Sequence, residues 1–357
     1  MQKAFIGDLQ LESGEVLKQV EIGYQTYGTY DPNRDNAILV CHALTGDVYA
    51  VGDGSRPGWW EGLIGPDMPI DTNEYFVICS NVLGGCYGST GPASLNPETN
   101  RPYGSSFPMV TIRDMVRAQR CLLSELGVHH LYAVMGGSMG GMQVYEWAVE
   151  FPEMMNLVIP IATCSRLSAI AIAYNDVGRQ AIKNDPEWNG GDYYPGAGPS
   201  KGLAVARMLG MITYRTAELF EERFGRSFKQ ESENHALDIT FQIESYLRYQ
   251  GEKLVERFDA NSYLALLRAM DSHDIGRGRG GAEHAISRIR ATVLMIGITD
   301  DLLYPLEHQK EMANLMRQNG VEVEFHTLES KFGHDAFLVE FSRMGRIVTP
   351  YVKKVRS

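Results

Sequence analysis

The sequence predicts an α/β protein in which a mostly parallel sheet is flanked by helices and interrupted by a helical insertion. Short runs that are apolar throughout recur towards both ends of the chain, as at residues 37–41 and 293–296. Helical patterns separate several of these runs, which is the strand–helix–strand spacing of parallel sheets. The middle of the chain shows helical patterns and no strand run. These observations together indicate the fold class.

The first strands are expected at residues 37–41 and 75–79, because runs that are apolar on both faces suit a buried parallel sheet. A helix is expected at residues 111–126, since Gly127 follows it as a C-terminal cap. The next strand is expected at residues 131–135. This order gives one strand–helix–strand unit in the first half of the chain.

The pattern returns near the C-terminus, with strands expected at residues 293–296 and 321–328 around a helix at 306–318. Between the two ends, apolar residues recur at three- and four-residue steps in four stretches: 167–183, 202–224, 239–258 and 262–270. We therefore expect a core made of residues 1–164 and 286–357 and a helical lid at 165–285. Such a lid would cover the carboxyl edge of the sheet, where ligands bind.

Composition excludes several classes of function. The 357 residues include 33 Lys and Arg against 44 Asp and Glu, a net charge of −11, so no general attraction to nucleic acid or to an anionic membrane is expected. No apolar run approaches the length of a membrane span, and the first residues show no apolar secretory segment. The five cysteines are scattered and odd in number, which predicts free thiols and a cytoplasmic protein.

A nucleophile is predicted at Ser138. Residues 136–141 read Gly-Gly-Ser-Met-Gly-Gly and match G-x-S-x-G between an expected strand and a helix pattern at 142–150. That context is the nucleophile elbow of the α/β-hydrolase fold, in which glycines permit a strained turn. A phosphate-binding loop is the alternative, but the G-K-[ST] that it needs is absent.

The serine needs a base and an acid, and in this fold they follow it along the chain in the order acid, then histidine. His334 lies in a loop directly after the last expected strand, where the fold places its base. Asp300 and Asp301 both follow the strand at 293–296, and their positions do not decide between them.

Two backbone N–H groups should hold the oxyanion of the reaction. We expect them at Met139, directly after the serine, and at Leu44, in the turn after the strand at 37–41. His42 precedes the serine, which is the wrong order for the base, so we interpret it as structural. No metal site is expected, because neither HExxH nor CxxC spacing occurs.

The chain resembles the homoserine O-acetyltransferase family of the α/β-hydrolase superfamily over essentially its whole length. The resemblance is carried by the long segment 81–92, by the elbow at 136–143 and by Gly-His-Asp at 333–335. It implies that the acid begins an Asp-x-Leu-aromatic-Pro segment. Residues 301–305 fit that register, which favours Asp301 over Asp300.

The resemblance also implies the residues that hold the acceptor. Arg207 and Tyr214, seven positions apart on the lid, match the family's acceptor-binding pair, and Asp335 corresponds to the residue that meets the amino group. Arginine and carboxylate carry the charges that a zwitterion requires. An exposed lid arginine and a loop carboxylate that orients its neighbour are the alternative interpretations of Arg207 and Asp335.

The implied partners are L-homoserine as acceptor and acetyl-CoA as co-substrate, with no resident cofactor and with a homodimer formed through the lid helices. The product would be O-acetylhomoserine, on the route to methionine. A succinyl donor or a serine acceptor would use the same chemistry, and an esterase or peptidase would use the same triad. A binding module without catalytic activity is a further alternative.

A glycine-rich segment at 276–281 formally matches G-x-G-x-x-G. No strand precedes it, so we interpret it as the hinge that closes the lid rather than as a dinucleotide site. Its two arginines, Arg277 and Arg279, are candidates to meet the phosphates of coenzyme A.

Overall fold

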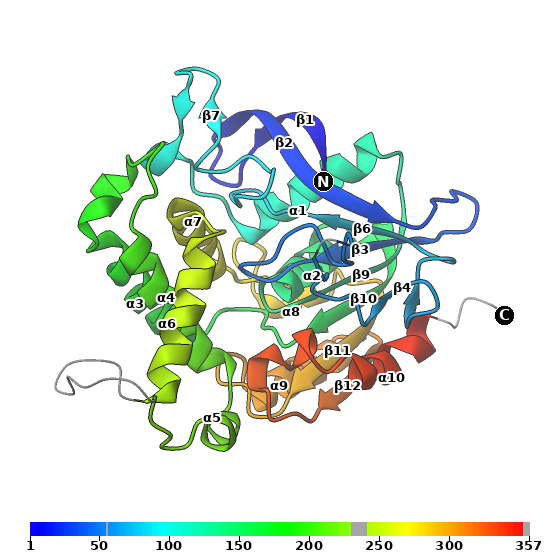
Figure 1. Ribbon diagram of the computed structural model, residues 1–357. Coiled ribbons are helices and arrows are strands. Elements are labelled where there is room, and N and C mark those ends of the chain that lie inside the picture. The colour runs from blue at the N-terminus through cyan, green and yellow to red at the C-terminus, as the bar shows by residue number, and fades with distance from the viewer. Residues whose placement is uncertain (55, 230–240, 353–357) are drawn as a thin grey trace.

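The computed structural model describes residues 1–54, 56–229 and 241–352, and it contains a central sheet with helices on both faces (Figure 1). The sheet has eight strands in the order β1-β2-β6-β3-β9-β10-β11-β12. The hairpin of β1 (Gln2–Gln10) and β2 (Val16–Tyr27) is antiparallel, and β2 also pairs antiparallel with β6. The remaining strands pair in parallel.

The parallel part of the sheet is the buried centre of the molecule. Its strands are β3 (Ala37–Cys41), β6 (Phe76–Ser80), β9 (Leu131–Gly137), β10 (Met155–Ile161), β11 (Thr292–Ile298) and β12 (Val323–Leu328). All five expected strands are therefore present, with ends shifted by a few residues. Every residue of β3 and β9 is buried, as a sheet covered on both faces requires.

Three strands of the main sheet are missing from the sequence prediction. β1 and β2 have mixed burial along their length, so they lack the continuous apolar run that marks a doubly covered strand. β10 contains Pro160, which has no N–H for a strand ladder and is a signal against a central strand.

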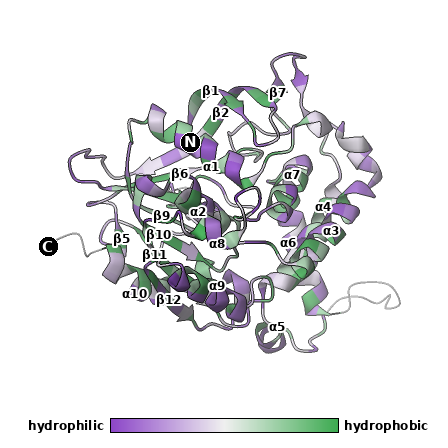
Figure 2. Ribbon diagram, turned by 180° about the vertical axis from the view of Figure 1, so that it is seen from behind, coloured by the Kyte–Doolittle hydropathy of each residue, from purple (hydrophilic) through white to green (hydrophobic). Residues whose placement is uncertain are grey.

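The helices of the core cover both faces of the sheet. They are α1 (Ile112–Glu125), α2 (Met139–Glu150), α8 (Ala282–Ile286), α9 (Leu306–Gln318) and α10 (Phe341–Val352). α1 begins at a capping box between Thr111 and Asp114, and Gly127 after it has a φ of +70°. Figure 2 shows hydrophobic residues along the central strands and hydrophilic ones on the outside of α9.

The lid helices follow β10 and precede β11 along the chain, and they lie at one end of the sheet (Figure 1). They are α3 (Ala169–Lys183), α4 (Ser200–Tyr214), α5 (Ala217–Arg223), α6 (Gln242–Val255) and α7 (Ala260–Asp271). The first residues of the helix expected at 239–258 lie outside the described residues. The division of the chain at 165 and 285 stays a prediction.

One expected helix, at 202–224, is wrong, because the structure divides it into α4 and α5. Arg215 has an extended backbone, with φ −120° and ψ 154°, and the hydroxyl of Thr216 caps α5 by accepting the N–H of Leu219 at 3.1 Å. A threonine at a helix start supplies the acceptor that the first turn lacks. The chain therefore turns at Arg215 rather than continuing as one helix.

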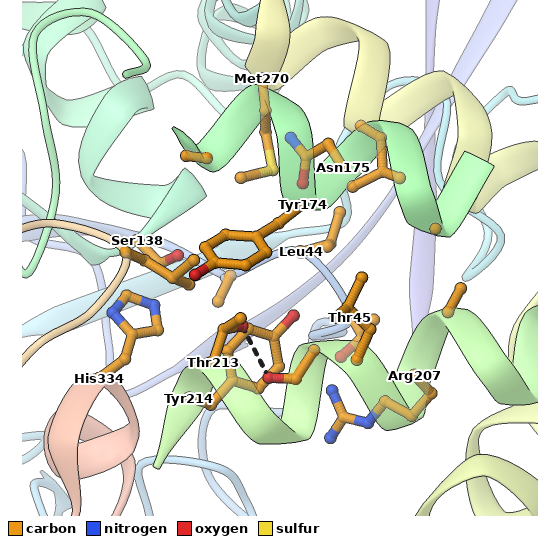
Figure 3. Close-up of a pocket in the computed structure, with 18 of the residues that line it drawn as sticks. Leu44, Thr45, Ser138, Tyr174, Asn175, Arg207, Thr213, Tyr214, Met270 and His334 are labelled. Atoms are coloured by element: carbon orange, nitrogen blue, oxygen red, sulfur yellow. Dashed lines mark hydrogen bonds between the residues drawn. The ribbon is translucent and has the colours of Figure 1, made fainter. Parts of the chain in front are cut away.

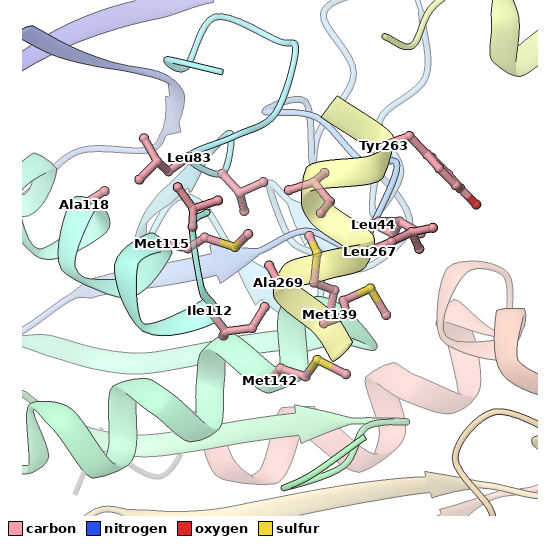
Figure 4. Close-up of a cluster of buried hydrophobic side chains, with 14 of the residues drawn as sticks. Leu44, Leu83, Ile112, Met115, Ala118, Met139, Met142, Tyr263, Leu267 and Ala269 are labelled. Atoms are coloured by element: carbon pink, nitrogen blue, oxygen red, sulfur yellow. The ribbon is translucent and has the colours of Figure 1, made fainter. Parts of the chain in front are cut away.

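An apolar cluster attaches the lid to the core. Figure 4 shows α7 lying over α1 and α2, with Met115, Met139 and Met142 of the core helices near Leu267 and Ala269 of α7. Methionine fills irregular gaps well, which suits a contact between helices that cross at an angle. This cluster places the lid directly above the start of α2.

Short elements complete the fold. They are β4 (Ile64–Gly65), β5 (Ile70–Asp71), β7 (Leu95–Asn96), β8 (Arg101–Pro102), η1 (Gly104–Ser106), η2 (Pro152–Met154), η3 (Pro186–Gly191) and η4 (Gly333–Leu338). Within the described ranges, no helix is both long and apolar enough to cross a membrane.

Candidate active site

Ser138 lies at the turn between β9 and α2, in a backbone conformation that residues with a side chain rarely adopt. Its φ is +58° and its ψ is −123°. Its N–H donates to the carbonyl of Ile161 at 2.9 Å, and the hydroxyl of Thr163 donates to its carbonyl at 2.7 Å. The neighbouring strand therefore holds the strained turn in place, which is how a nucleophile elbow keeps its serine above the sheet.

The glycines around Ser138 are required by close packing against β3. A Cβ on Gly140 would lie 2.1 Å from the carbonyl oxygen of Cys41, and a Cβ on Gly136 would lie 2.6 Å from the same oxygen. Both contacts are with backbone, so a side chain at Gly140 would force α2 away from the sheet and one at Gly136 would force β9 away from β3. The glycine pattern of the motif thus has a direct steric cause.

Asp301 and His334 are brought together from two loops at the carboxyl edge of the sheet. Oδ2 of Asp301 lies 2.8 Å from Nδ1 of His334, while Oδ1 accepts the N–H groups of Leu303 and Tyr304 at 2.9 and 3.0 Å. Asp300 is exposed and has a φ of +55°. Of the two adjacent acids, the structure therefore places Asp301 beside the histidine.

His334 is buried among aromatic rings. The ring centroids of Tyr304, Phe337 and Tyr214 lie 5.2, 5.6 and 5.8 Å from its own. Burial alone would lower the pKa of His334, but the charge and hydrogen bond of Asp301 raise that pKa above its ordinary value. Because Nδ1 is engaged with Asp301, Nε2 is the nitrogen left for a proton from Ser138.

Ser138 and His334 face a pocket beneath the lid, with a volume of about 120 Å³. In Figure 3 the two side chains lie next to each other at one end, and Arg207 on α4 lies at the other end. The pocket is bounded on its upper side by α3 and α7 and on its lower side by α4. Ser138 and Arg207 thus share one cavity.

The two expected oxyanion donors lie beside the serine. Leu44 lines the pocket, and within the described part of the chain its N–H has no hydrogen-bond acceptor. Met139 is the first residue of α2, so its N–H precedes the first hydrogen bond within that helix. Neither position contradicts the prediction, and both roles stay predictions.

His42 has a structural environment. Its Nδ1–H donates to the carbonyl of Ala43 at 2.7 Å, and its Nε2 accepts from the Asn81 side chain at 2.9 Å and from the Val82 N–H at 3.2 Å. Burial lowers the pKa of His42, which keeps this ring neutral and leaves Nε2 able to accept its two hydrogen bonds. The ring therefore ties the turn that carries Leu44 to the first residues of segment 81–92.

Arg207 and Tyr214 both point into the pocket from α4. The guanidinium carbon of Arg207 lies 5.5 Å from the ring centroid of Tyr214. Tyr263 of α7 hydrogen-bonds the phenol of Tyr214, and burial raises the pKa of both phenols. Within the described residues, no carboxylate lies at salt-bridge distance from Arg207. Its charge is available to an anionic group in the pocket.

Asp335 also lines the pocket, and it already has one basic partner. Nη2 of Arg215 lies 3.0 Å from Oδ2 of Asp335, and both side chains are largely buried. The family resemblance implies a role for Asp335 at the acceptor's amino group, but no pattern in the sequence singles out Arg215. The break between α4 and α5, which sequence periodicity does not reveal, is what brings Arg215 to this position.

Three tyrosines of the pocket were also missed. Tyr174 extends from α3 with its hydroxyl end towards Ser138 and His334 (Figure 3), Tyr263 comes from α7, and Tyr304 follows Asp301. Burial raises the pKa of Tyr304 well above its ordinary value. Tyr174 and Tyr263 lie on apolar helix faces, where a tyrosine in a sequence is typical of core packing, whereas Tyr304 is the aromatic residue of segment 301–305.

The expectation for the glycine-rich segment 276–281 needs a correction. Arg279 lies 2.7 Å from Glu146 and 2.6 Å from Glu150, and Arg277 lies 2.9 Å from Glu12. These arginines are thus paired with carboxylates rather than held free for the phosphates of coenzyme A. The sequence does not reveal the contacts of Arg279 with α2 and of Arg277 with Glu12, because the partners lie more than a hundred residues away.

No group of histidine, cysteine, aspartate and glutamate side chains in the described ranges is arranged to hold a metal ion. The site brings together a serine, a histidine and the carboxylate that contacts this histidine. An arginine and a second carboxylate line the same pocket. This set suits acyl transfer through a covalent serine intermediate.

Comparison with known proteins gives consistent results. The model of the α/β hydrolase fold family matches residues 36–341. A homoserine O-acetyltransferase of Carboxydothermus hydrogenoformans is 50% identical over 361 aligned positions, which cover 99% of this chain and 95% of that protein. One of Symbiobacterium thermophilum is 52% identical over 98% of this chain and 93% of that protein.

Solved structures agree on the fold. The crystal structure of homoserine O-acetyltransferase from Bacillus anthracis superposes with a TM-score of 0.93 at 32% identity, covering 99% of this chain and 97% of that one. The structure of an esterase, E22, superposes with a TM-score of 0.91 at 29% identity, covering 99% of both chains. The backbone alone therefore does not separate a transferase from a hydrolase.

Proposed function

The chain belongs to the homoserine O-acetyltransferase family of the α/β-hydrolase fold, and we infer that it transfers the acetyl group of acetyl-CoA to the hydroxyl of L-homoserine. The product is O-acetylhomoserine, an intermediate on the route to methionine. The reaction takes place in two half-reactions that share one serine. We propose that Ser138 and His334 act in both steps, whereas Arg207 and Asp335 act only in the second.

In the first half-reaction, Nε2 of His334 takes the proton of the Ser138 hydroxyl as the serine oxygen attacks the thioester carbonyl. Asp301 stabilises the imidazolium that forms, through its 2.8 Å contact with Nδ1. The N–H groups of Leu44 and Met139 hold the oxyanion, where loss of one such donor typically costs about 10²–10³ in rate. The C–S bond then breaks, coenzyme A leaves as a thiol with the proton from His334, and acetyl-serine remains.

In the second half-reaction, His334 takes the proton of the homoserine hydroxyl while that oxygen attacks the acetyl-serine. Collapse of the intermediate returns the proton to Ser138 and releases the ester. Arg207 holds the carboxylate of homoserine and Asp335 its ammonium group, with Tyr214 beside Arg207. Water competes at this step, so the lid over Ser138 favours transfer by limiting access.

The observation that carries this proposal is that one pocket joins the Ser138–His334 pair to a carboxylate and to an arginine that has no carboxylate partner among the described residues. A zwitterionic amino acid with a side-chain hydroxyl fits such a pocket. A simple ester has no use for either charge. The charged half of the pocket thus favours transfer to an amino acid over the ester hydrolysis that the name of esterase E22 indicates.

Two details are proposed on family membership rather than on geometry. The acyl donor is acetyl-CoA rather than succinyl-CoA, and the acceptor is homoserine rather than serine.

We also propose a cytoplasmic location. A homodimer through the lid is supported by large apolar residues that α3, α4 and α6 expose, namely Ile170, Val177, Val205, Ile212 and Tyr249. Light scattering on the purified chain tests the dimer.

The test of the function follows the covalent intermediate. Wild-type protein incubated with acetyl-CoA alone should gain one acetyl group by intact mass, and Ser138→Ala should gain none. Homoserine should remove the label and appear as O-acetylhomoserine, whereas succinyl-CoA and serine should be poor substitutes. Equal labelling of both proteins would exclude Ser138 as nucleophile, and label lost to water at the same rate with or without homoserine would indicate an esterase.

A further inference from the structure

The contact between Arg215 and Asp335 extends the acceptor site beyond the residues that line the pocket. We propose that Arg215 is a positioning residue, which orients the Asp335 carboxylate so that one oxygen is presented to the ammonium group of the acceptor. This role rests on the proposed function, because it presupposes an acceptor with an ammonium group. Arg215 itself does not touch the substrate.

The geometry separates the two residues by role. Asp335 is one of the residues that line the pocket, whereas Arg215 is not. Nη2 of Arg215 binds Oδ2 of Asp335 at 3.0 Å, and the two side chains are 17% and 14% exposed. This contact is an ion pair, and within the described part of the chain the other oxygen, Oδ1, has neither an ion-pair nor a hydrogen-bond partner. Arg215 therefore holds the carboxylate from outside the pocket and leaves Oδ1 for a ligand.

The backbone brings Arg215 to this position by a specific break in the lid. Arg215 is the extended residue between α4 and α5, and the hydroxyl of the next residue, Thr216, donates to the carbonyl of Lys331 at 2.5 Å. Gly333, with a φ of +60°, packs so closely here that a Cβ on it would lie 3.2 Å from the carbonyl of Tyr214. The end of α4 is thus attached to the loop that carries His334 and Asp335.

Stability alone does not account for this pair. Nε of Arg215 is buried without a hydrogen-bond partner in the described part of the chain, and its guanidinium carbon lies 5.9 Å from the ring of Phe332. An apolar pair of similar volume often stabilises such a contact as well as an ion pair does. What the ion pair adds is direction, because it favours the orientation of the Asp335 carboxylate in which Oδ2 faces Arg215.

Two arginines of the lid thus have separate roles in acceptor binding. Arg207 lies in the pocket, with no carboxylate partner among the described residues, and meets the anionic end of the acceptor. Arg215 lies behind the pocket and acts on the cationic end through Asp335. Displacement of a binding group by about 1 Å can cost about a hundredfold in rate, so fixing this carboxylate has a measurable value.

The experiment is a double-mutant cycle on Arg215→Met and Asp335→Asn in the full-length protein, with each half-reaction measured separately. Free thiol released by acetyl-CoA without acceptor reports the first step, and kcat/KM for homoserine reports the second. We expect Arg215→Met to form acetyl-enzyme at a near-normal rate and to lose about tenfold to a hundredfold in kcat/KM for homoserine. In the Asp335→Asn background, Arg215→Met should cost nothing further.

The matched control is Glu222→Gln, which removes an exposed ion pair with Lys331 between the same two segments and should leave both half-reactions unchanged. Additive losses in the cycle, equal damage to both half-reactions or an unchanged kcat/KM for homoserine would each overturn the proposal. If Arg215→Met does not fold, Arg215→Gln keeps a donor for the buried carboxylate and carries the same cycle. A wild-type protein that makes no O-acetylhomoserine would instead refute the proposed function.

Discussion

Two groups of charges differ in whether every arginine has a carboxylate partner. The first, here called the hinge cluster, joins the glycine-rich segment to α1, α2 and the β1–β2 turn through Glu12, Arg113, Arg117, Glu146, Glu150, Arg277 and Arg279. Each of its arginines has a carboxylate within 3.2 Å. The second, the pocket charges, comprises Asp301, His334, Asp335, Arg207 and Arg215, and there Arg207 has no carboxylate partner within the described residues.

Under the proposed function, the same residue types serve stability in one place and binding in another. A buried charge without a partner is costly, so a fold normally supplies one. In the hinge cluster the fold supplies a carboxylate to every arginine, and no charge remains for a ligand. In the pocket Arg207 is held in the same cavity as Ser138 and His334 with its charge unused. Experiments on the two groups can either widen this contrast or remove it.

The largest effect should come from the pocket charge closest to the reaction. Asp301→Asn should lower turnover by about 10⁴, because the imidazole loses the anion that orients it and stabilises its charged form. The thermal midpoint should change little by comparison. Asp300→Asn is the control, since Asp300 is exposed and should be nearly neutral. A reversed pair of results would mean that the geometry of this loop is misassigned by one residue.

The opposite result is expected in the hinge cluster. Arg279→Met leaves the buried Glu146 with fewer charge partners and should lower the free energy of unfolding by about 3–5 kcal/mol. Arg277→Met, whose side chain is 42% exposed, should cost at most about 1 kcal/mol. Urea unfolding measures both. If kcat/KM of folded Arg279→Met also fell by an amount equivalent to its loss in the free energy of unfolding, the hinge cluster would belong to the active site. The difference between the two groups of charges would then disappear.

The third experiment concerns the unpartnered arginine. Arg207→Ala should still form acetyl-enzyme at a near-normal rate, because no amino acid takes part in that step. Its kcat/KM for homoserine should fall well over tenfold, since loss of a buried charge-assisted contact commonly costs about 2–5 kcal/mol. Arg207→Lys should rescue this partly, as lysine lacks the planar fork. Stability should be retained, in contrast to Arg279→Met.

An undiminished kcat/KM for homoserine in Arg207→Ala would return this residue to the role of an exposed lid arginine. Equal damage to both half-reactions would instead assign it to coenzyme A binding or to the folding of the lid. Either outcome would remove the distinction between the two groups of charges.

The smallest expected effect concerns pH: activity and stability should be lost in different pH ranges. The pKa of His334 is raised above 6.5, so kcat/KM for acetyl-CoA should fall as the pH drops through a value above 6.5. Arginine partners outweigh burial and lower the pKa of Glu12 and Glu150 below 4.5, so their contribution to stability persists until the pH falls through those lowered values. Activity should therefore be lost in a pH range where the fold remains intact.

The direction of the pKa shift of His334 also predicts that activity is lost before the fold as the pH falls. A raised pKa means that protonation of His334 stabilises the folded state below its unfolded pKa, and this stabilisation is lost as the pH rises through the folded value. Acidification therefore does not unfold the protein through His334. A pH–rate profile and urea unfolding at matched pH values check this, and coincident loss of rate and stability would contradict it. In Asp301→Asn the acid limb of the profile should shift to lower pH.

Much of the fold and of the candidate site could be predicted from local patterns. Buried parallel strands are apolar throughout, and a nucleophile elbow needs glycine next to the serine. Each can therefore be recognised from a short continuous stretch of sequence. The order of serine, acid and histidine then follows from the fold. The sequence does not predict the β1–β2 hairpin, because its strands have mixed burial and no continuous apolar run. It does not predict β10 because Pro160 is a signal against a central strand.

The sequence by itself thus determined the α/β class, the position of Ser138 at its elbow and His334 after the last strand. Tertiary structure alone decided which charges meet, because ion pairing depends on distances between segments far apart in the chain. It joined Arg279 to α2 and Arg215 to Asp335, and left Arg207 without a carboxylate partner among the described residues. A helical repeat reports which face is apolar, but not what lies opposite its polar side chains.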